Sequence, residues 1–370
     1  MNCRKLAGIL MLVILALKLP PAGALAQDVP MAGGRTTLGP VDSPPSLADT
    51  TVDQSPWGGG GDANFGQPRP SGRWSASADF LMLYRLGGNV NQELVSTAPH
   101  PPQIGPSIEV LNADQLHPSF SDGPRVGLTY HGDDGFELEA LYFQTDGRPS
   151  VGAVGPDAAN WLVMTAPGGF FQTQDYDDQL MAWTYRSRLY NGEFNVRWNP
   201  SDRLTMLAGF RWTNLSEDLQ GTLPPERSTP FWETKTRNNL YGFQIGGGWK
   251  IVDRGRFSIN AVGKAGIFDN CVDEMTNVSI YRVVYPESAS TNHAAFVGEI
   301  DLECRYQVSP RLSLKLAYQA LWLEGVALAP GQIQETYSNI AVPVYVQALG
   351  IDSRSGVVYQ GVTAGIEYAF

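Results

Sequence analysis

Residues 74–85 read Trp-Ser-Ala-Ser-Ala-Asp-Phe-Leu-Met-Leu-Tyr-Arg, and this stretch sets the pattern of the chain. Every even-numbered residue from 74 to 84 is apolar or aromatic, whereas Ser75, Ser77, Asp79 and Arg85 fall on the opposite side. A β-strand with one apolar and one polar face has this period of two residues. The stretch therefore predicts a strand that separates an apolar environment from a polar one.

Nine further segments repeat this alternation, at about 124–131, 135–144, 182–198, 203–215, 236–251, 256–268, 293–308, 311–323 and 356–370. Several of them run to 13 or more residues. Strands of soluble proteins centre on about five or six residues. A tilted strand that crosses a bilayer needs about 9 to 11 residues within the hydrocarbon alone. The lengths therefore favour membrane strands.

The connections between these segments alternate between short and long. The short ones are tight turns at 131–134, 199–202, 253–255 and 309–310. The long ones are expected as loops at roughly 87–123, 145–180, 216–235, 269–292 and 324–354. Short periplasmic turns and long extracellular loops are typical of outer-membrane barrels. We expect an all-β fold, a closed antiparallel up-and-down transmembrane β-barrel of about ten strands.

A count of twelve strands would follow if two further segments, 161–174 and 340–348, also crossed the membrane. We expect them instead to form hairpin-like extensions above it, because promoting them would leave very short neighbours. A soluble β-sandwich also alternates in polarity. Strand length and the two groups of aromatic residues near the strand ends favour the barrel.

The first 72 residues show no such alternation. Residues 1–26 resemble a cleaved signal peptide, with a basic start, an apolar stretch from Leu6 to Leu17 too short to span a bilayer, and a cleavage site at Ala24 and Ala26. Residues 27–72 are rich in glycine and proline and predict a flexible periplasmic linker. Residues 73–370 would then form an outer-membrane barrel.

The last predicted strand ends with aromatic residues on its outward face. Tyr368 and Phe370 are expected at the periplasmic rim, where this strand can close against the first one. We expect these two residues to serve barrel assembly. The predicted partners are outer-membrane lipids and the outer-membrane assembly machinery; the sequence sets no oligomeric state.

Acidic residues gather in the predicted loops. The five long loops contain 20 Asp or Glu and 5 Lys or Arg, a net charge of −15. Such a surface repels anionic polymers, so nucleic acid is not an expected partner. Divalent cations at these acidic loops are a second candidate partner, although no loop has the Asp-x-Asp-x-Asp-Gly spacing of a calcium site.

Strand parity places charged residues of both signs in the lumen. The expected acids are Asp79, Glu137, Glu139, Glu193, Glu299, Asp301, Glu303 and Glu367. The expected bases are Arg85, Arg125, Arg197, Arg211, Lys250, Lys264, Arg305 and Lys315. Wide aqueous lumens belong to barrels of about 16 to 18 strands. With ten strands, these charges are expected to pair with one another across a narrow interior.

Three stretches resemble a known family. They are Leu207–Glu217, Leu240–Gly246 and the run Tyr318–Trp322 with Ala329–Ile333. In these motifs the chain is similar to β-barrel porin family seven, which is common in planctomycetes, and the similarity covers most of 73–370. Asp79–Tyr84 is also similar, although the family more often has an acid followed by Leu and paired Trp there. Leu328–Gly331 departs from the family's usual Arg-Pro-Gly run. The resemblance implies an outer-membrane barrel and a pore, and it supplies no functional residues.

Three functions are open from the sequence. The first is a porin-like narrow passive pore for small solutes, and the second is a non-conducting anchor or adhesin that displays acidic loops. The third is a hydrolase at the outer rim, for which His293 near Asp269 and Asp273 could form an acid-histidine pair. No serine-nucleophile elbow or metal-binding histidine pair is present. We therefore expect no enzyme, no cofactor and no metal.

Overall fold

The computed structural model describes residues 73–370 apart from 89, 100–105, 117, 119, 156–159, 173–179, 225–226 and 340. The predicted signal peptide, its cleavage site and the predicted linker lie outside the described residues. Within the described part of the chain, no helix has the length and apolar character that crossing a bilayer requires.

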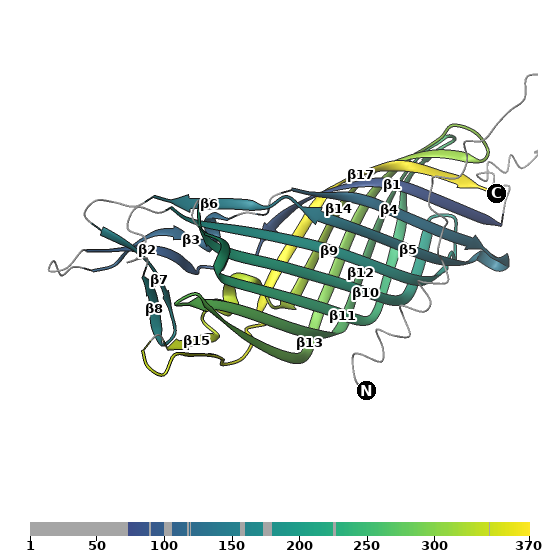
Figure 1. Cartoon of the computed structure of the whole chain (residues 1–370). Helices are drawn as coiled ribbons and strands as arrows, with labels where there is room; N and C mark the ends of the chain where they lie inside the picture. The colour runs from purple at the N-terminus through teal and green to yellow at the C-terminus, as the bar shows by residue number, and fades with distance from the viewer. Residues whose placement is uncertain are drawn as a thin grey trace, which may run out of the picture. The chain divides into compact units, whose positions relative to one another are not determined.

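Ten long strands form the body of the fold, and Figure 1 shows them side by side. They are β1 (Trp74–Gly87), β4 (Phe120–His131), β5 (Phe136–Gly147), β9 (Met181–Trp198), β10 (Leu204–Leu223), β11 (Arg227–Arg254), β12 (Phe257–Ile280), β13 (Val283–Gln307), β14 (Leu312–Val326) and β17 (Ser355–Ala369). Each strand pairs antiparallel with its neighbours, and the sheet closes on itself. The predicted ten-stranded up-and-down barrel is confirmed.

Closure places the two ends of the barrel sequence side by side. β1 pairs with β17 from Ser75 opposite Ala369 to Gly87 opposite Val357. At the rim, Phe370 N–H donates to the carbonyl of Trp74 at 2.8 Å. Every backbone group of a strand in lipid needs a partner within the protein, and closure supplies one along both edges.

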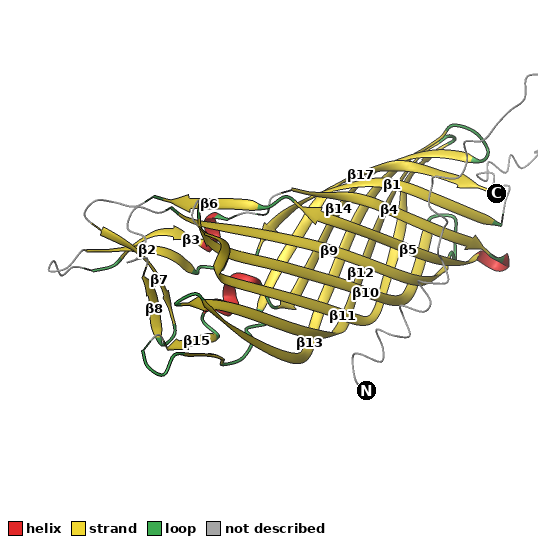
Figure 2. Cartoon of the chain, in the orientation of Figure 1, coloured by secondary structure: helices red, strands yellow, loops and turns green. Residues whose placement is uncertain are grey.

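The smaller elements gather at the end of the barrel away from the C-terminus (Figures 1 and 2). A four-stranded sheet contains β3 (Ile108–Asn112), β2 (Glu93–Pro99), β7 (Asn160–Ala166) and β8 (Gly169–Gln172) in this order. β6 (Ser150–Val154) pairs with β9, and β15 (Thr336–Asn339) pairs with β16 (Tyr345–Ala348). Among the described residues, the 3₁₀ helices at this end are η1 (Ala113–Gln115) and η4 (Ala329–Ile333), whereas η2 (Asp133–Gly135) is an exception and lies in the turn between β4 and β5 at the opposite end. Residues 161–172 and 341–348 thus contribute to hairpins outside the ten barrel strands, as expected.

Two of the predicted loops are wrong. The segments expected as loops at 216–235 and 269–292 are mostly strand, because β10 continues to Leu223, β11 begins at Arg227, β12 reaches Ile280 and β13 begins at Val283. The strands thus extend well beyond the part that faces lipid. Their apolar residues change sides there, so an outward apolar pattern no longer marks them.

The change of side is visible in side-chain exposure. In the membrane part, outward residues such as Phe243, Ile245 and Ile267 are exposed by 71–77%. Further along the same strands, inward residues such as Trp232 and Val278 are completely buried. The apolar surface therefore faces lipid in one part and the barrel axis in the other.

Candidate functional site in the barrel lumen

Four charged side chains meet in the middle of the lumen. They are Glu193 on β9, Arg211 on β10, Lys264 on β12 and Glu299 on β13, and all four are buried. Lys264 Nζ lies 3.0 Å from Glu193 Oε2 and 2.9 Å from Glu299 Oε1. Arg211 Nη1 lies 2.7 Å from Glu299 Oε2 and 3.7 Å from Glu193 Oε1. The two acids and two bases neutralise one another across the interior.

Amide side chains complete this cluster. Gln244 Nε2 donates to Glu193 Oε2 at 2.8 Å and to Asn195 Oδ1 at 2.8 Å. Asn191 Oδ1 accepts from Arg211 Nε at 2.7 Å. These contacts hold the charged groups in place, since buried charges require both an opposite charge and hydrogen-bond partners.

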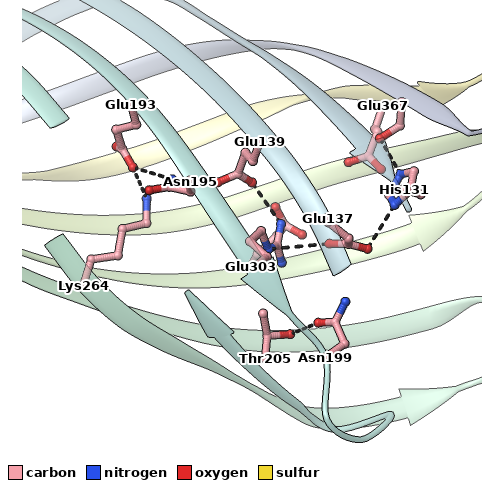
Figure 3. A network of polar contacts seen from close by, with 12 residues as sticks. His131, Glu137, Glu139, Glu193, Asn195, Asn199, Thr205, Lys264, Glu303 and Glu367 are labelled. Atoms are coloured by element: carbon pink, nitrogen blue, oxygen red, sulfur yellow. Dashed lines mark hydrogen bonds and ion pairs between the residues drawn. The ribbon is translucent and has the colours of Figure 1, made fainter. Parts of the chain in front are cut away.

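A second set of ion pairs lies nearer the periplasmic turns, and Figure 3 shows part of it. Arg197 Nη1 lies 2.9 Å from Glu139 Oε2, and Arg197 Nε lies 3.7 Å from Glu137 Oε2. Glu137 also contacts His131 Nδ1 at 3.0 Å. The acids of β5 are thus shared between an arginine of β9 and a histidine of β4.

Most of the remaining predicted lumen residues also have polar partners inside the barrel, and one of them, Lys250, lies at its periplasmic end. Arg305 lies 3.0 Å from both Glu303 and Glu367. Lys315 Nζ lies 3.0 Å from Asp79 Oδ2, and Arg125 donates to Gln319 at 3.1 Å. Asp301 is buried among this group, whereas Lys250 lies at the periplasmic end beside Asp253 at 3.3 Å.

An apolar layer lies above these charges. Inward residues from nine of the ten barrel strands form it, and they are Leu81, Leu83, Phe143, Leu189, Leu215, Leu240, Phe268, Ala295, Val297, Leu321, Leu323, Val326, Val357 and Tyr359. Leu328, which follows β14, is completely buried in the same layer. Inward positions at this height therefore pack against one another instead of lining water.

Residues 326–333 fold into the lumen, and we call them the plug segment. Val326 and Leu328 lie within the apolar layer, whereas Ala329 and Ile333 belong to a second apolar cluster. Val326 to Ala329 are completely buried. Asn238 on β11 binds the backbone of Ala327 twice, donating to its carbonyl at 2.8 Å and accepting from its N–H at 2.7 Å. The N–H of Ala329 donates to Glu217 Oε2 at 2.9 Å. Inward polar side chains thus replace the backbone partners that the plug segment lacks.

Arg85 and Glu217 form an ion pair beneath the plug segment. Arg85 Nη1 lies 2.5 Å from Glu217 Oε1, and both side chains are buried. The hydroxyl of Tyr185 donates to Glu217 Oε2 at 2.7 Å, and burial raises the pKa of Tyr185, so that it remains a donor. A cavity of about 10 Å³ beside Arg85 and Tyr185 has room for about one water molecule.

Sequence reasoning missed several residues of this region. Glu217 was expected in a loop, although extending the parity of Arg211 by six residues would have placed it inside. Tyr185, Asn191, Asn238 and Gln244 are uncharged and were not considered lumen residues, but each contacts a charged group or the plug segment. Ala329 to Ile333, noted only for their family resemblance, form η4 within the plug segment.

The acid-histidine pair on which the hydrolase alternative depended, His293 with Asp269 or Asp273, is not formed. His293 points inward and its Nε2 lies 2.8 Å from the carbonyl oxygen of Gly325. Both aspartates are exposed, and Asp273 accepts from Ser290 at 2.9 Å. Asn270 is the residue of β12 opposite His293, and both point inward. Asp269 and Asp273 occupy the alternate positions of β12, so their carboxylates point outward, away from the histidine.

In the part of the chain that the structure describes, no group of three or more His, Cys, Asp or Glu side chains could hold a metal ion.

The two aromatic residues predicted to serve assembly lie on the outer face at the periplasmic rim. Tyr368 is 45% exposed and Phe370 is 56% exposed.

No family model matches the sequence, and no curated protein matches it either. Among solved structures, the chain is similar to the outer membrane protease OmpT of Escherichia coli, with 11% identity, 81% of this chain and 97% of that chain covered, and a TM-score of 0.46. It is also similar to the toluene transporter TbuX of Ralstonia pickettii, with 10% identity, 80% of this chain and 88% of that chain covered, and a TM-score of 0.30. The toluene transporter TodX of P. putida is similar with 9% identity, 81% of this chain and 90% of that chain covered, and a TM-score of 0.31. At these values the likeness carries no information on activity.

The chain is an outer-membrane β-barrel, since a closed antiparallel barrel with an outward apolar belt and a self-paired polar interior fits that environment. The resemblance to β-barrel porin family seven remains a prediction.

Proposed function

We propose that this protein is a non-conducting outer-membrane anchor whose barrel carries a folded outer part for surface interactions. The observation that carries the proposal is the apolar core of that outer part. It combines inward residues of β9, β10, β11 and β12 with residues of β2, β3, β7, η4 and β16. A solute could pass only if this core opened.

The large side chains of this core come both from the barrel strands and from the smaller outer elements. Trp183, Tyr185 and Trp232 on barrel strands are buried together with Leu162 and Met164 on β7. Trp183 contacts Phe231 edge to face, with ring centroids 5.5 Å apart. Burial of each large apolar side chain contributes about 1.5–3 kcal/mol. The barrel thus acts as the base on which the outer segments fold.

The layers below support the same proposal. The apolar layer and the charge clusters lie in the lumen between the plug segment and the periplasmic turns. Ion pairs that neutralise one another offer no net charge to select an ion. No catalytic role is proposed.

A passive pore is the second candidate, and one observation favours it. The backbone of the plug segment is bound by the side chains of Glu217 and Asn238, and these hydrogen bonds can exchange for water. If the plug segment moved, a narrow path could open. The acidic loops would then favour cations.

Conductance in planar bilayers separates these functions. The purified full-length barrel should produce no stable current steps, and liposomes that contain it should not swell in small sugars. Asn238→Ala, which removes both hydrogen bonds to Ala327, serves as a matched variant for the pore candidate. Stable steps in the unmodified protein would contradict the anchor proposal; steps only in Asn238→Ala would show that the plug segment closes a pore.

A further inference from the structure

Four basic side chains face outward at one level of the barrel. Arg186 and Arg188 lie on β9, and Lys235 and Arg237 lie on β11. In the register of β9, β10 and β11, Arg188 and Arg237 flank Ser216, and Arg186 and Lys235 flank Asp218. Arg237 is exposed and the other three are half-exposed. We call these four residues the basic patch.

The level of the basic patch relative to the membrane follows from the aromatic residues below it. Tyr190 is the next outward residue beneath Arg188 on β9, and Tyr241 is the second outward residue beneath Arg237 on β11. A strand rises about 3.3 Å per residue, so Arg188 lies roughly 7 Å along the strand above Tyr190. Interfacial aromatic residues mark the boundary of the hydrocarbon. The basic patch therefore lies at the height of lipid headgroups.

The surroundings of the basic patch have the opposite charge. Outward positions on other strands above the level of the aromatic residues carry Asp146, Asp273 and Glu324, and Asp269 lies level with Tyr241. The predicted loops beyond them add to this negative field. A concentration of basic residues within an acidic outer surface marks the place where an anion would bind.

The local ion pairs leave part of the basic patch available. Arg188 Nε lies 3.2 Å from Asp146, and Lys235 Nζ lies 2.6 Å from Glu233. Among the described residues, Arg186 and Arg237 form no ion pair. Exposed ion pairs contribute only about 0–1 kcal/mol, so the two paired cations can also turn to a ligand.

We propose that the basic patch binds the phosphate group of an anionic lipid in the outer leaflet of the outer membrane. A guanidinium group donates two parallel hydrogen bonds to phosphate oxygens. Arg188 and Arg237 on either side of Ser216 can hold one phosphate, and Arg186, which shares Asp218 with Lys235, adds to the attraction of a doubly charged headgroup. The acyl chains would lie along the exposed apolar faces of β9, β10 and β11, where Phe194, Phe210 and Phe243 point outward. The binding site thus joins a polar head and an apolar tail on one face.

The test is a lipid titration followed by native mass spectrometry. Full-length barrel in detergent is titrated with a diphosphorylated glucosamine lipid, and separately with the same lipid without its phosphates. The variant Arg186→Gln/Arg188→Gln/Arg237→Gln should bind the phosphorylated lipid about tenfold more weakly or worse, because each basic residue near the surface adds to the attraction of an anionic headgroup. The unphosphorylated lipid should bind both proteins equally weakly.

A control variant, Arg148→Gln/Arg282→Gln/Arg354→Gln, removes three exposed arginines outside the basic patch and should retain the affinity of the unmodified protein. If the triple variant does not fold, Arg237→Gln alone should still weaken binding severalfold, since this side chain is exposed. Equal affinity of the patch and control variants would overturn the proposal. Displacement of the lipid by inorganic phosphate at matched concentration would also overturn it, because the site would then recognise a free anion.

Discussion

The strand β12 carries two opposite patterns along its length. In its membrane part, Ala265 and Ile267 face lipid while Lys264 faces the interior ion pairs. In its outer part, Val278 and Ile280 face the axis and are buried, while Asp273 faces water. The change follows from the surroundings, because lipid surrounds the first part and water the second. The same sheet is thus a membrane wall at one end and the shell of a water-soluble core at the other.

The comparison predicts the largest effect for a truncation within the outer core. Trp232→Ala removes a completely buried side chain and should cost about 3–5 kcal/mol in the free energy of opening the outer part. Hydrogen exchange measured by mass spectrometry should then show faster exchange in 227–236 and 274–285.

The matched control is Phe243→Ala on the same strand, where the side chain is 77% exposed toward lipid. It should change exchange in the outer part very little. Equal loss of protection in both variants would mean that the two parts do not differ as described.

The next largest effect is expected when an arginine is placed on the outward face of the barrel, because it should destabilise the membrane part but not the outer part. Ile300→Arg on β13 places a cation against hydrocarbon and should cost about 2–4 kcal/mol in a liposome refolding titration. Ser288→Arg, outward on the same strand but in water, should cost less than about 0.5 kcal/mol. Similar costs at both positions would place the membrane boundary elsewhere.

A pH dependence is expected from Glu274 in the outer part. The pKa of Glu274 is raised from 4.5 to about 7, chiefly by burial, with a smaller contribution from nearby Glu287. Its carboxyl accepts from Thr276, which ends a chain of hydrogen bonds from Trp232 through Thr234. No ion pair of Glu274 is formed among the described residues.

The sign follows from proton binding. Between about pH 4.5 and pH 7 the closed outer part holds one proton more than the open form, so the free energy of opening falls as pH rises and is constant above this range. The loss should be about 1–3 kcal/mol. The protection factors of amides in 270–280, which are corrected for the intrinsic exchange rate at each pH, should fall over this range in the unmodified protein. In Glu274→Gln this fall should disappear, and its persistence would assign the effect to another group.

The smallest effect is expected at the tip of the β12–β13 hairpin. Tyr281 and Arg282 form the turn with φ of 51° and 66°, in the left-handed region that favours glycine. Arg282→Gly should stabilise the hairpin by up to about 1 kcal/mol. Slower exchange of amides at 278–285 would show it. Faster exchange would mean that the arginine side chain contributes more than its backbone costs.

Much of the membrane part could be predicted from the sequence. Residues 74–84 show the outward apolar face, and the parity that follows from it gave the inward charges, from Asp79 to Glu367. This prediction was possible because every outward position of a strand in lipid, which is every second residue, must be apolar. The tight turns fixed the order and number of the strands.

The outer part could not be predicted in the same way. Beyond Trp212 on β10 the outward residues are Asn214, Ser216 and Asp218, so the outward apolar pattern ends although the strand continues. The inward apolar residues, such as Leu219, pack against loop segments distant in sequence. Only the three-dimensional contacts show that Ala327 and Ala329 lie in the lumen.

Cysteine scanning of β12 tests the inversion of polarity most directly. Single cysteines at 275–280 are treated with a membrane-impermeant maleimide on intact cells, and labelling is located by peptide mass spectrometry. The outward positions Met275→Cys, Asn277→Cys and Ser279→Cys should label, whereas Thr276→Cys, Val278→Cys and Ile280→Cys should not, because the latter side chains are buried in the described structure. Labelling of the inward positions at rates similar to the outward ones would contradict a packed core and would indicate a water-filled lumen.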